Sequence, residues 1–489
     1  MLLGKLFSEA GLECPEEYSN IEISRIVTDS REACEQCMFI CVSGYNTDGH
    51  EYISQAIDKG AVVIVSERVC DECVGGAAII KIDNTRRAAA LLYNAQCGKP
   101  SEKLKLIGVT GTNGKTSVCH MLESIFSEAG VRCGVIGTVG VRALGQEIAP
   151  CREGMTTPDA AGLYPLLAKM ADMGVTHVFM EVSSHSLAQY RVEGIEFECG
   201  IFTNLTRDHL DFHGSMEEYF RQKASLFSRC RHKIINADDA YGKKLLDIYE
   251  GCVTCSVGGD GDFCAREICC WTDKTQYKLK FGGGELEISL GALGDFSVFN
   301  SLEAAAAALT LGISPTALIG GLSRFLGAKG RMERVLDGDC PFEVIVDYAH
   351  TPDALERLLT SVRSIKKPRG RIILVFGCGG DRDRGKRKQM GRIASRLADL
   401  VVITSDNSRS ERPEDIIAEI LKGIDKEKPH KTIVSRRQAI EYAIESAAED
   451  DIVVLAGKGH EKYEIDSDGK HFFDEVQIAR AAARKNKKN

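Results

Sequence analysis

The sequence predicts an α/β protein of three domains. A central, doubly wound parallel sheet is expected between a small N-terminal α/β domain and a C-terminal Rossmann-like domain. Three observations support this class. The chain has 489 residues, more than one hydrophobic core normally organises. Short apolar runs alternate with stretches of helical periodicity, as in parallel sheets with helical crossovers. A glycine-rich turn also joins one apolar run to an amphipathic helix near residue 110.

Residues 1–100 form the first predicted domain. The apolar runs 39–42 and 61–65 predict two strands, and a helix is expected to begin near Tyr52. Strands separated by a helix indicate a small α/β unit.

Residues 101–329 form the second predicted domain. The apolar run 104–110 predicts a buried strand, and apolar residues recur at helical spacing from Val118 to Ala129. A strand, a glycine turn and a helix are the opening unit of a doubly wound nucleotide-binding domain. Further strands are expected at 133–136, 176–181, 199–203 and 233–236, and the segment 252–290 is expected to be a β-rich insertion.

Residues 330–489 form the third predicted domain. Four apolar runs are strand candidates, with helical segments between them: 342–346, 371–376, 399–404 and 451–456. Strands that alternate with helices imply a parallel sheet with right-handed crossovers. This domain is therefore predicted to be Rossmann-like.

Composition and charge narrow the function classes. Apolar residues make up 44% and charged residues 27% of the chain, and the net charge is −8. This composition is typical of globular domains, and the negative charge argues against a nucleic-acid partner, which needs a basic surface. The sequence has neither a signal peptide's apolar stretch nor a run of about 18 apolar residues. We therefore expect a cytoplasmic protein that does not insert into a membrane. We also expect a monomer, although the composition does not indicate the oligomeric state.

The chain has 19 cysteines. Two C-x-x-C pairs, Cys34/Cys37 and Cys70/Cys73, have the format of a four-cysteine zinc site. The gap between the pairs is longer than in compact zinc ribbons, and no histidine cluster accompanies them. We interpret the cysteines as free thiols in a reducing compartment.

The turn after the first central strand carries the strongest functional signal. Its residues are Gly111, Thr112, Asn113, Gly114, Lys115, Thr116 and Ser117. The backbone N–H groups, the start of the next helix and the Lys115 ammonium suit a polyphosphate, and Thr116 is placed to bind Mg²⁺. The usual phosphate loop has a glycine where this chain has Val109. We expect this P-loop to bind ATP or GTP.

The strand 176–181 ends in a carboxylate, Glu181. An acid at the carboxyl end of a strand, opposite a phosphate loop, is a reasonable Mg²⁺ ligand, and an exposed strand-end glutamate is the alternative. The segment 203–214, with two histidines and two aspartates, follows another strand. Lys223 lies on the helix after it, and a solvated lysine is its ordinary interpretation.

Four motifs in succession resemble those of the Mur ligase family, which also includes folylpolyglutamate synthetase. They are Thr-Gly-Thr-Asn-Gly-Lys-Thr at 110–116, Glu-Val-Ser-Ser-His at 181–185, Thr-Asn-Leu-x-x-Asp-His-Leu-Asp-x-His at 203–213 and Tyr-x-x-x-Lys-x-x-Leu-Phe at 219–227. The resemblance implies that ATP and Mg²⁺ are the cofactors. It assigns catalytic roles to Lys115, Glu181, His209 and Lys223, and Mg²⁺ ligation to Thr116, Glu181, His209 and Lys223 as a carbamate.

Further stretches resemble the family's nucleotide contacts. By resemblance Asn300 lies near the adenine, Arg331 reaches the ATP phosphates and Asp347 binds the ribose. Ser297 stands where the family has an asparagine.

Other stretches resemble the family's contacts to a UDP-linked substrate. Ser30 and Arg31 match positions near the uridine and the diphosphate. The positions that face the sugar-peptide part are Thr156, Thr157, Ser183, Gln189 and Arg191. A planar guanidinium such as that of Arg191 suits a phosphate or a carboxylate.

The residues expected to bind the incoming amino acid follow strands of the third domain. They are Arg382, Asp406, Asn407, Arg409, Gly457 and Glu461. Open α/β sheets bind ligands at this carboxyl edge. The family member that adds meso-diaminopimelate has Asp-Asn-Pro-Arg where this chain has Asp-Asn-Ser-Arg at 406–409, and its arginine grips the distal carboxylate. Arg409 therefore favours diaminopimelate over lysine, and Glu461 would take the distal ammonium.

The resemblance covers nearly the whole chain. It implies an ATP-dependent amide ligase that adds meso-diaminopimelate to UDP-N-acetylmuramoyl-L-Ala-D-Glu through an acyl phosphate, in peptidoglycan synthesis. Two alternatives stay open. A related ligase could use lysine or a folate substrate. A P-loop switch could instead hydrolyse nucleotide without regard to amino acids.

Overall fold

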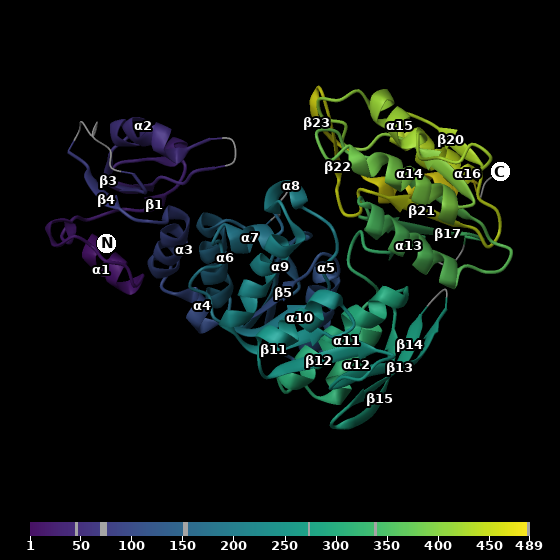
Figure 1. The fold of residues 1–489 in the computed structure, drawn as a ribbon, viewed down its shortest axis with the longest axis horizontal. Coiled ribbons are helices and arrows are strands. Elements are labelled where there is room, and N and C mark those ends of the chain that lie inside the picture. Colours follow the sequence, from purple (N-terminus) through teal and green to yellow (C-terminus); the bar gives the residue numbers. More distant parts are fainter. Residues whose placement is uncertain (45–46, 69–75, 150–154, 272–273, 337–339, 487–489) are drawn as a thin grey trace.

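The computed structural model describes residues 1–489 apart from 45–46, 69–75, 150–154, 272–273, 337–339 and 487–489. The described residues form three main sheets that follow one another along the molecule in sequence order, from the purple N-terminal part through the teal centre to the green and yellow C-terminal part (Figure 1). The predicted three-part α/β fold is confirmed. The boundaries after residues 100 and 329 stay predictions.

The N-terminal sheet contains four parallel strands in the order β1-β2-β3-β4. Their bounds are β1 Ile26–Val27, β2 Cys37–Ile40, β3 Ala61–Ser66 and β4 Ala78–Lys81. Both strands predicted here are present. The helix predicted near Tyr52 is α2 (Ile53–Asp58), which follows a 3-10 turn at Gly49–Tyr52. Helix α1 (Leu3–Glu9) packs its buried leucines against this unit.

The central sheet has eleven strands among the described residues, in the order β15-β14-β13-β12-β11-β10-β5-β9-β6-β7-β8. Their bounds are β5 Lys105–Thr110, β6 Cys133–Gly137, β7 Gly140–Ala143, β8 Gln146–Ala149, β9 His177–Glu181, β10 Phe197–Phe202, β11 Cys230–Asn236, β12 Cys252–Val257, β13 Phe263–Cys270, β14 Thr275–Phe281 and β15 Gly284–Leu290. Strand β5 lies in the middle, parallel to β9 and β10.

Helices cover both faces of this sheet. They are α3 Thr85–Gln96, α4 Pro100–Lys103, α5 Lys115–Glu128, α6 Ala160–Asp172, α7 Ser184–Ala188, α8 Leu210–His213, α9 Met216–Ala224, α10 Ala240–Ile248, α11 Asp295–Thr310 and α12 Pro315–Arg324. Alternate residues of β9 enter different cores. Val178 and Met180 pack with α3 and α6, whereas Phe179 packs with α5, α11 and α12. Burial on both faces is what makes the central strands uniformly apolar in sequence.

The sequence prediction for this domain needs two corrections. The segment 252–290 is not an insertion, because β12 pairs with β11 and β13–β15 extend the same sheet. The sheet is also mixed: β13–β15 at one edge and β6–β8 at the other pair antiparallel. Edge strands with one solvated face alternate apolar and polar residues, which is why this segment resembled a separate β unit.

The C-terminal sheet has the order β16-β17-β21-β18-β19-β20. Its strands are β16 Glu333–Arg334, β17 Glu343–Asp347, β18 Ile372–Phe376, β19 Leu400–Ile403, β20 His430–Thr432 and β21 Ile452–Ala456. The four predicted strands are its four central ones and they run parallel, while the short β16 is antiparallel. A separate hairpin, β22 Tyr463–Asp466 and β23 Gly469–Phe472, follows β21.

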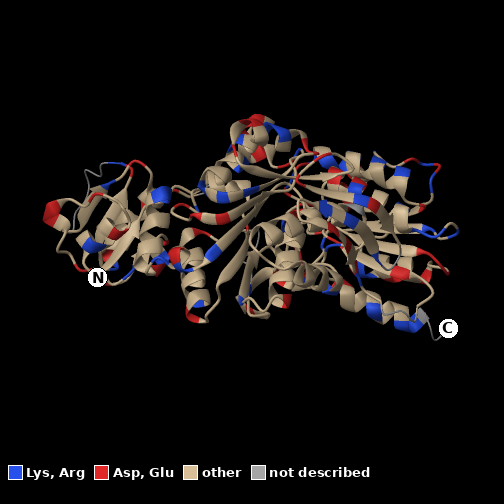
Figure 2. Cartoon of the chain, turned by 90° about the horizontal axis from the view of Figure 1, so that it is seen from below, with Lys and Arg blue, Asp and Glu red and all other residues tan. Residues whose placement is uncertain are grey.

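Two layers of helices cover the C-terminal sheet. One layer contains α13 Pro352–Ile365, α14 Gly385–Leu397 and α15 Pro413–Leu421; the other contains α16 Arg436–Glu445 and α17 Glu475–Asn486. Basic and acidic residues are interspersed over all three parts of the chain in Figure 2.

Candidate active site

The phosphate loop lies at the carboxyl end of β5, in the middle of the central sheet. Val109 is inside the strand, opposite Ile201 and Glu181 of its neighbours, so the loop begins only at Gly111. A Cβ atom on Gly111 would lie 1.9 Å from Thr203 Oγ1, and one on Gly114 would lie 2.4 Å from Asn300 Oδ1. Gly114 also has a φ of +92°, which favours glycine. The two glycines therefore lie where neighbouring segments approach the loop too closely for a side chain.

Two lysines share one carbonyl of this loop. Lys115 Nζ donates to Gly111 O at 2.8 Å and to Thr112 O at 2.9 Å. Lys223 Nζ, from α9, donates to Gly111 O at 2.8 Å and lies 4.8 Å from the centre of the Tyr219 ring. Burial, and then the charge of Lys115, lower the pKa of Lys223 well below its usual range. Helix α9 thus places a buried lysine of lowered pKa against the phosphate loop.

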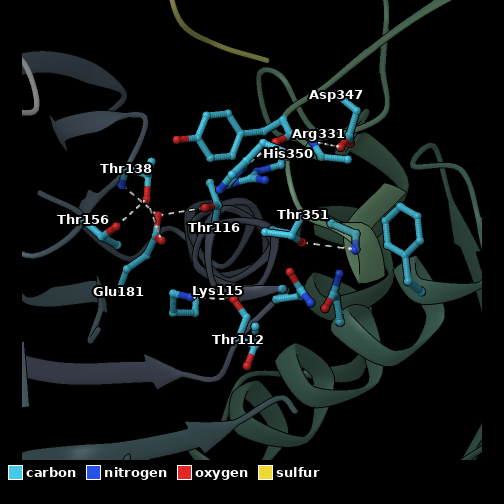
Figure 3. Close-up of a pocket in the computed structure, with 18 of the residues that line it drawn as sticks. Thr112, Lys115, Thr116, Thr138, Thr156, Glu181, Arg331, Asp347, His350 and Thr351 are labelled. Atoms are coloured by element: carbon cyan, nitrogen blue, oxygen red, sulfur yellow. Dashed lines mark hydrogen bonds between the residues drawn. The ribbon is translucent and has the colours of Figure 1, made fainter. Parts of the chain in front are cut away.

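Glu181 is the buried carboxylate at the end of β9. It is 1% exposed and accepts hydrogen bonds from Thr116 Oγ1 at 2.9 Å, Thr138 N at 2.9 Å and Thr138 Oγ1 at 3.0 Å (Figure 3). All three donors are neutral. A carboxylate beside the hydroxyl of the loop threonine is an oxygen-only set of the kind that Mg²⁺ prefers.

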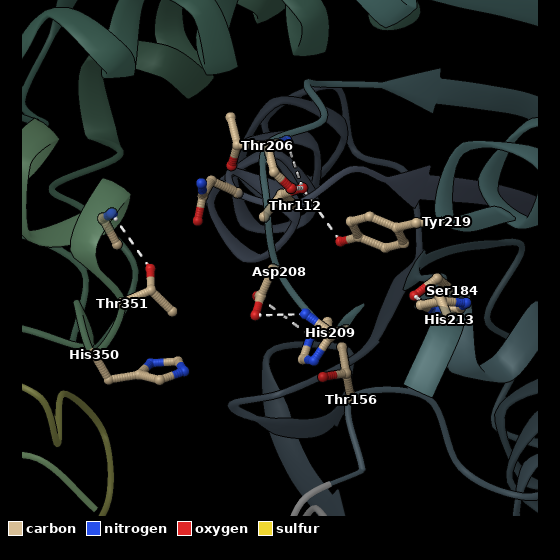
Figure 4. Close-up of polar contacts among 12 residues, drawn as sticks. Thr112, Thr156, Ser184, Thr206, Asp208, His209, His213, Tyr219, His350 and Thr351 are labelled. Atoms are coloured by element: carbon tan, nitrogen blue, oxygen red, sulfur yellow. Dashed lines mark hydrogen bonds and ion pairs between the residues drawn. The ribbon is translucent and has the colours of Figure 1, made fainter. Parts of the chain in front are cut away.

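The segment after β10 carries His209. Its backbone has a φ of +52°, and its ring Nε2 lies 3.4 Å from Asp208 Oδ2 (Figure 4). Burial lowers the pKa of His209. The His185 ring lies edge-on to it with 4.8 Å between ring centres, and His213 stacks on Tyr219. These aromatic rings hold the segment against α7 and α9.

One cavity of about 670 Å³ joins the central and C-terminal parts of the chain. The central part contributes Thr112 to Ser117, Thr156, Glu181, His209 and Asn300, and the C-terminal part contributes Arg331, Asp347, His350 and Glu461 (Figure 3). Asp347 accepts hydrogen bonds from the N–H groups of Met332 and Ala349, each at 2.7 Å. The phosphate loop and the C-terminal part of the chain therefore line the same cavity.

A direct contact also links the two parts. Asp353 Oδ2, at the start of α13, accepts hydrogen bonds from Asn113 Nδ2 and Thr206 Oγ1, both at 3.2 Å. Asn113 belongs to the phosphate loop. The loop and the C-terminal part are thus joined by a carboxylate that sequence reasoning missed.

The predicted Mg²⁺ ligands are only partly brought together. Thr116 and Glu181 touch, and His209 lines the same cavity, but Lys223 is not among the lining residues. In the described part of the chain, no three His, Cys, Asp or Glu side chains gather closely enough to hold a metal ion. The four-residue ligand set therefore stays a prediction.

Four of the five residues predicted to face the sugar-peptide part form one network, and Thr156 reaches it through Thr138. Arg191 Nη1 donates to Thr157 O at 2.6 Å, and its Nη2 donates to Gln189 Oε1 at 2.7 Å. Thr157 Oγ1 donates to Glu181 O at 2.7 Å and lies 3.4 Å from Ser183 Oγ. Thr156 Oγ1 accepts a bond from Thr138 Oγ1 at 3.2 Å. The network therefore includes the backbone carbonyl of Glu181, whose side chain is the buried carboxylate at the end of β9.

Ser30 lies apart from that network, in the N-terminal domain. Its side chain is buried and donates to Gln55 Oε1 at 2.7 Å. Arg31 is exposed and pairs with Asp29 at 2.7 Å. The structure thus places the two predicted uridine-side residues on a different unit from the phosphate loop.

The residues predicted to bind the amino acid gather at the carboxyl edge of the C-terminal sheet. Asn407 Nδ2 donates to Glu461 Oε2 at 2.9 Å, and Arg409 Nη1 donates to Gly380 O at 2.8 Å. A Cβ atom on Gly457 would lie 2.6 Å from Asp406 Oδ2. Burial raises the pKa of Glu461, which faces the shared cavity. Arg382 lies on the exposed turn before α14 and donates to Asp381 O at 3.2 Å.

Several residues of the site were not predicted as contacts. They are Thr138, Asp353, Lys458, His460 and Tyr463. Lys458 and His460 lie within the stretch Gly457–Glu461 already singled out after the last strand. Thr138 and Asp353 lacked a comparable signal, because single threonines and aspartates at turns and helix starts are common.

The zinc alternative gains no support. Cys34 N donates to Cys37 Sγ at 3.4 Å, and every cysteine in the described ranges is a free thiol. Cys70 and Cys73 lie outside the described residues.

Within the described ranges, none of the helices is both long and apolar enough to cross a membrane.

Three family descriptions match the chain. Residues 22–104 match "Mur ligase family, catalytic domain", residues 109–308 match "Mur ligase middle domain" and residues 330–459 match "Mur ligase, glutamate ligase domain". A protein of Clostridium tetani named UDP-N-acetylmuramoyl-L-alanyl-D-glutamate–2,6-diaminopimelate ligase is 42% identical over 462 residues, which are 94% of each chain. Its namesake in Clostridioides difficile is 43% identical over 94% of this chain and 95% of that protein.

Solved structures agree. A structure of UDP-N-acetylmuramoyl-L-alanyl-D-glutamate–2,6-diaminopimelate ligase matches with a TM-score of 0.72 and 31% identity, and the match covers 100% of both chains. A MurF ligase from Thermotoga maritima in complex with ADP matches with a TM-score of 0.63 at 16% identity, covering 95% of this chain and 98% of that one. The latter shows the shared fold alone.

Proposed function

The chain belongs to the Mur ligase family, and we propose that it adds meso-diaminopimelate to UDP-N-acetylmuramoyl-L-Ala-D-Glu with consumption of ATP. This is a cytoplasmic step of peptidoglycan synthesis. The observation that carries the proposal is the shared cavity, in which Lys115 and Glu181 of the central domain face Arg331 and Glu461 of the C-terminal domain. A ligase needs such a volume because it must hold nucleotide, acceptor and amine together.

The reaction we propose has two steps. The free carboxylate of the substrate attacks the γ-phosphate of ATP, which gives an acyl phosphate and ADP. The amine of the incoming amino acid then attacks the acyl carbon, and the tetrahedral intermediate expels phosphate. No protein nucleophile takes part, so the protein acts through positioning and electrostatics.

Lys115 and Arg331 are the cations we assign to the phosphates. Both line the cavity, one from each side, and the helix α5 begins at Lys115 with its N–H groups toward the loop. Helix N-termini and ammonium groups stabilise polyphosphates. Asn300 and Asp347 are assigned to the adenine and the ribose because they lie on the same walls.

Thr116 and Glu181 would hold Mg²⁺, with His209 on the same cavity wall. The ion supplies charge neutralisation for the transferred phosphoryl group. We assign Lys223 a carbamate. Carbamylation needs a neutral amine, and the lowered pKa of this buried lysine favours that form.

Ser30 is assigned to the uridine end of the acceptor. Thr156, Thr157, Ser183, Gln189 and Arg191 are assigned to its sugar-peptide part. Hydrogen bonds among these residues extend to the backbone carbonyls of Thr157 and Glu181, so the acceptor's carboxylate can approach the phosphate loop from this side.

The protein is proposed to act as a monomer.

The amino-acid site is assigned to Arg382, Asp406, Asn407, Arg409, Gly457 and Glu461. Arg409 offers a cation for the distal carboxylate of diaminopimelate, and Glu461 offers an anion for an ammonium group. Lysine lacks the distal carboxylate. The half-buried guanidinium of Arg409 therefore favours diaminopimelate as the substrate.

The test measures phosphate release from ATP with UDP-N-acetylmuramoyl-L-Ala-D-Glu and with diaminopimelate, lysine or no amino acid. Strong stimulation by diaminopimelate alone is expected. Stimulation by lysine instead would overturn the choice of amino acid. Turnover indifferent to every addition would favour the P-loop switch and overturn the ligase.

A substitution sharpens the choice of amino acid. Arg409→Ala should raise the KM for diaminopimelate by about ten- to a hundred-fold, the usual cost of a charged hydrogen bond. Arg412→Ala removes an exposed arginine three residues away and should leave that KM unchanged. An equal effect of both variants would contradict the assignment of Arg409.

A further inference from the structure

Lys458 is a fully buried lysine that none of the assignments above uses. It follows β21, and its side chain is 0% exposed. Its Nζ donates to Asn407 Oδ1 and to Tyr463 O, each at 2.8 Å. Two carboxylates lie farther off, Asp406 Oδ1 at 3.7 Å and Glu461 Oε2 at 4.0 Å. A buried ammonium is costly unless such partners surround it.

Lys458 and the backbone N–H of Ile465 together decide how the Asn407 amide is turned. Asn407 Oδ1 accepts from Lys458 Nζ at 2.8 Å and from Ile465 N at 3.0 Å. Both partners are donors, so only the oxygen of the amide can face them. The amide nitrogen must then point the other way, where it donates to Glu461 Oε2 at 2.9 Å.

The same amide connects the two halves of the amino-acid site. Ile465, whose N–H donates to it, also accepts a bond from Arg409 N at 3.1 Å. Glu461 receives the amide's NH₂ group and lines the shared cavity. One asparagine therefore sets the spacing between the backbone of Arg409 and the carboxylate of Glu461.

We propose that Lys458 is a positioning residue of the amino-acid site: its buried ammonium orients the Asn407 amide so that Glu461 and Arg409 are held at the separation that a diamino dicarboxylic acid requires. This inference rests on the proposed function. Lys458 does not line the cavity, so it acts through the residues it contacts, above all through its hydrogen bond to Asn407.

The primary test compares Lys458→Met with the wild-type full-length enzyme. The KM for diaminopimelate should rise by about ten- to a hundred-fold, the cost of a lost charged hydrogen bond. The KM for ATP should stay the same, and kcat at saturating diaminopimelate should change by less than the KM. Lys458→Gln, which can still donate to Asn407 Oδ1, should recover part of the loss. Lys431→Met, at an exposed position of the same sheet, is the matched control.

A double-mutant cycle separates positioning from general damage. If Lys458 acts through Asn407 on Glu461, Lys458→Met should add little to the KM effect of Glu461→Gln. Additive effects, or an unchanged KM for diaminopimelate in Lys458→Met, would overturn the inference. If Lys458→Met does not fold, Asn407→Asp decides: it keeps the shape but replaces the NH₂ donor, and an unchanged KM would overturn the inference. A wild-type enzyme that diaminopimelate does not stimulate would instead refute the proposed function.

Discussion

The cations that bind the phosphate loop and the buried cations of the C-terminal domain have different kinds of partner. In the loop, Lys115 and Lys223 both donate to the main-chain carbonyl of Gly111. In the C-terminal domain, Arg436 of α16 pairs with Glu475 of α17 at 2.8 Å, and Arg387 of α14 pairs with Glu411 at 2.8 Å. The first pair of cations depends on backbone geometry, and the second depends on the identity of other side chains.

This difference separates residues that we propose to serve the chemistry from residues that stabilise the fold. Thr112, whose carbonyl accepts from Lys115, lines the cavity, where water can replace the ammonium of Lys115. Arg436 and Glu475 are both buried, at 0% and 1% side-chain exposure, so removal of one partner leaves an unpaired buried charge. Substitutions at the phosphate loop should therefore lower catalytic activity, whereas substitutions of the buried ion pairs should lower the free energy of unfolding.

The largest effect is expected for Arg436→Met. The variant leaves Glu475 buried without its cation, and also removes the bond from Arg436 Nη2 to Ala456 O at 2.9 Å. The free energy of unfolding should fall by ~3–5 kcal/mol, measured by urea unfolding. Arg437→Met, at the next and exposed position, should change it by less than ~0.5 kcal/mol. Equal losses in the two variants would remove the distinction drawn above.

The second largest effect is expected for Lys115→Met. Phosphate release should fall by roughly 10²–10³-fold, as when one preorganised charge is removed from a transition state. The free energy of unfolding should change by less than ~1 kcal/mol, because Lys223 still donates to Gly111 O and water from the cavity can reach the Thr112 carbonyl. Lys105→Met, at the exposed start of β5, is the control. A large loss of stability with activity retained would invert the comparison.

The smallest effect concerns pH. Hydrogen bonds from Arg387 lower the pKa of Glu411 to about 2, whereas a free glutamate titrates near 4.3. Stability from this carboxylate is therefore complete above about pH 4.3 and lost as the pH falls toward 2. Glu411→Gln lacks it, so the gap in unfolding free energy between wild type and variant should shrink over that range. Its size should be on the order of 1 kcal/mol, because Glu411 is partly exposed. A gap that stays constant from pH 5 to 2.5 would contradict this assignment.

Sequence patterns predicted much of the fold correctly where the signal is local. The strand–loop–helix unit at 104–129 was recognised because its glycines, apolar run and helical period are contiguous. The edge strands were harder. Alternation in 252–290 identified strands, but nothing local says that β12 pairs with β11 instead of starting a separate sheet.

The site divides in the same way. The phosphate loop and the stretch 457–461 could be singled out from the sequence because their residues are neighbours in the chain, and Glu181 because it ends an apolar strand. The roles assigned to them stay predictions. Only the tertiary structure decided that Lys458 meets Asn407 and that Asp353 meets Asn113, since 51 and 240 residues separate these partners. Such contacts depend on how β19 and β21 are ordered in the sheet and how α13 faces the loop, and pairing between distant segments leaves no trace in the composition or periodicity of either one.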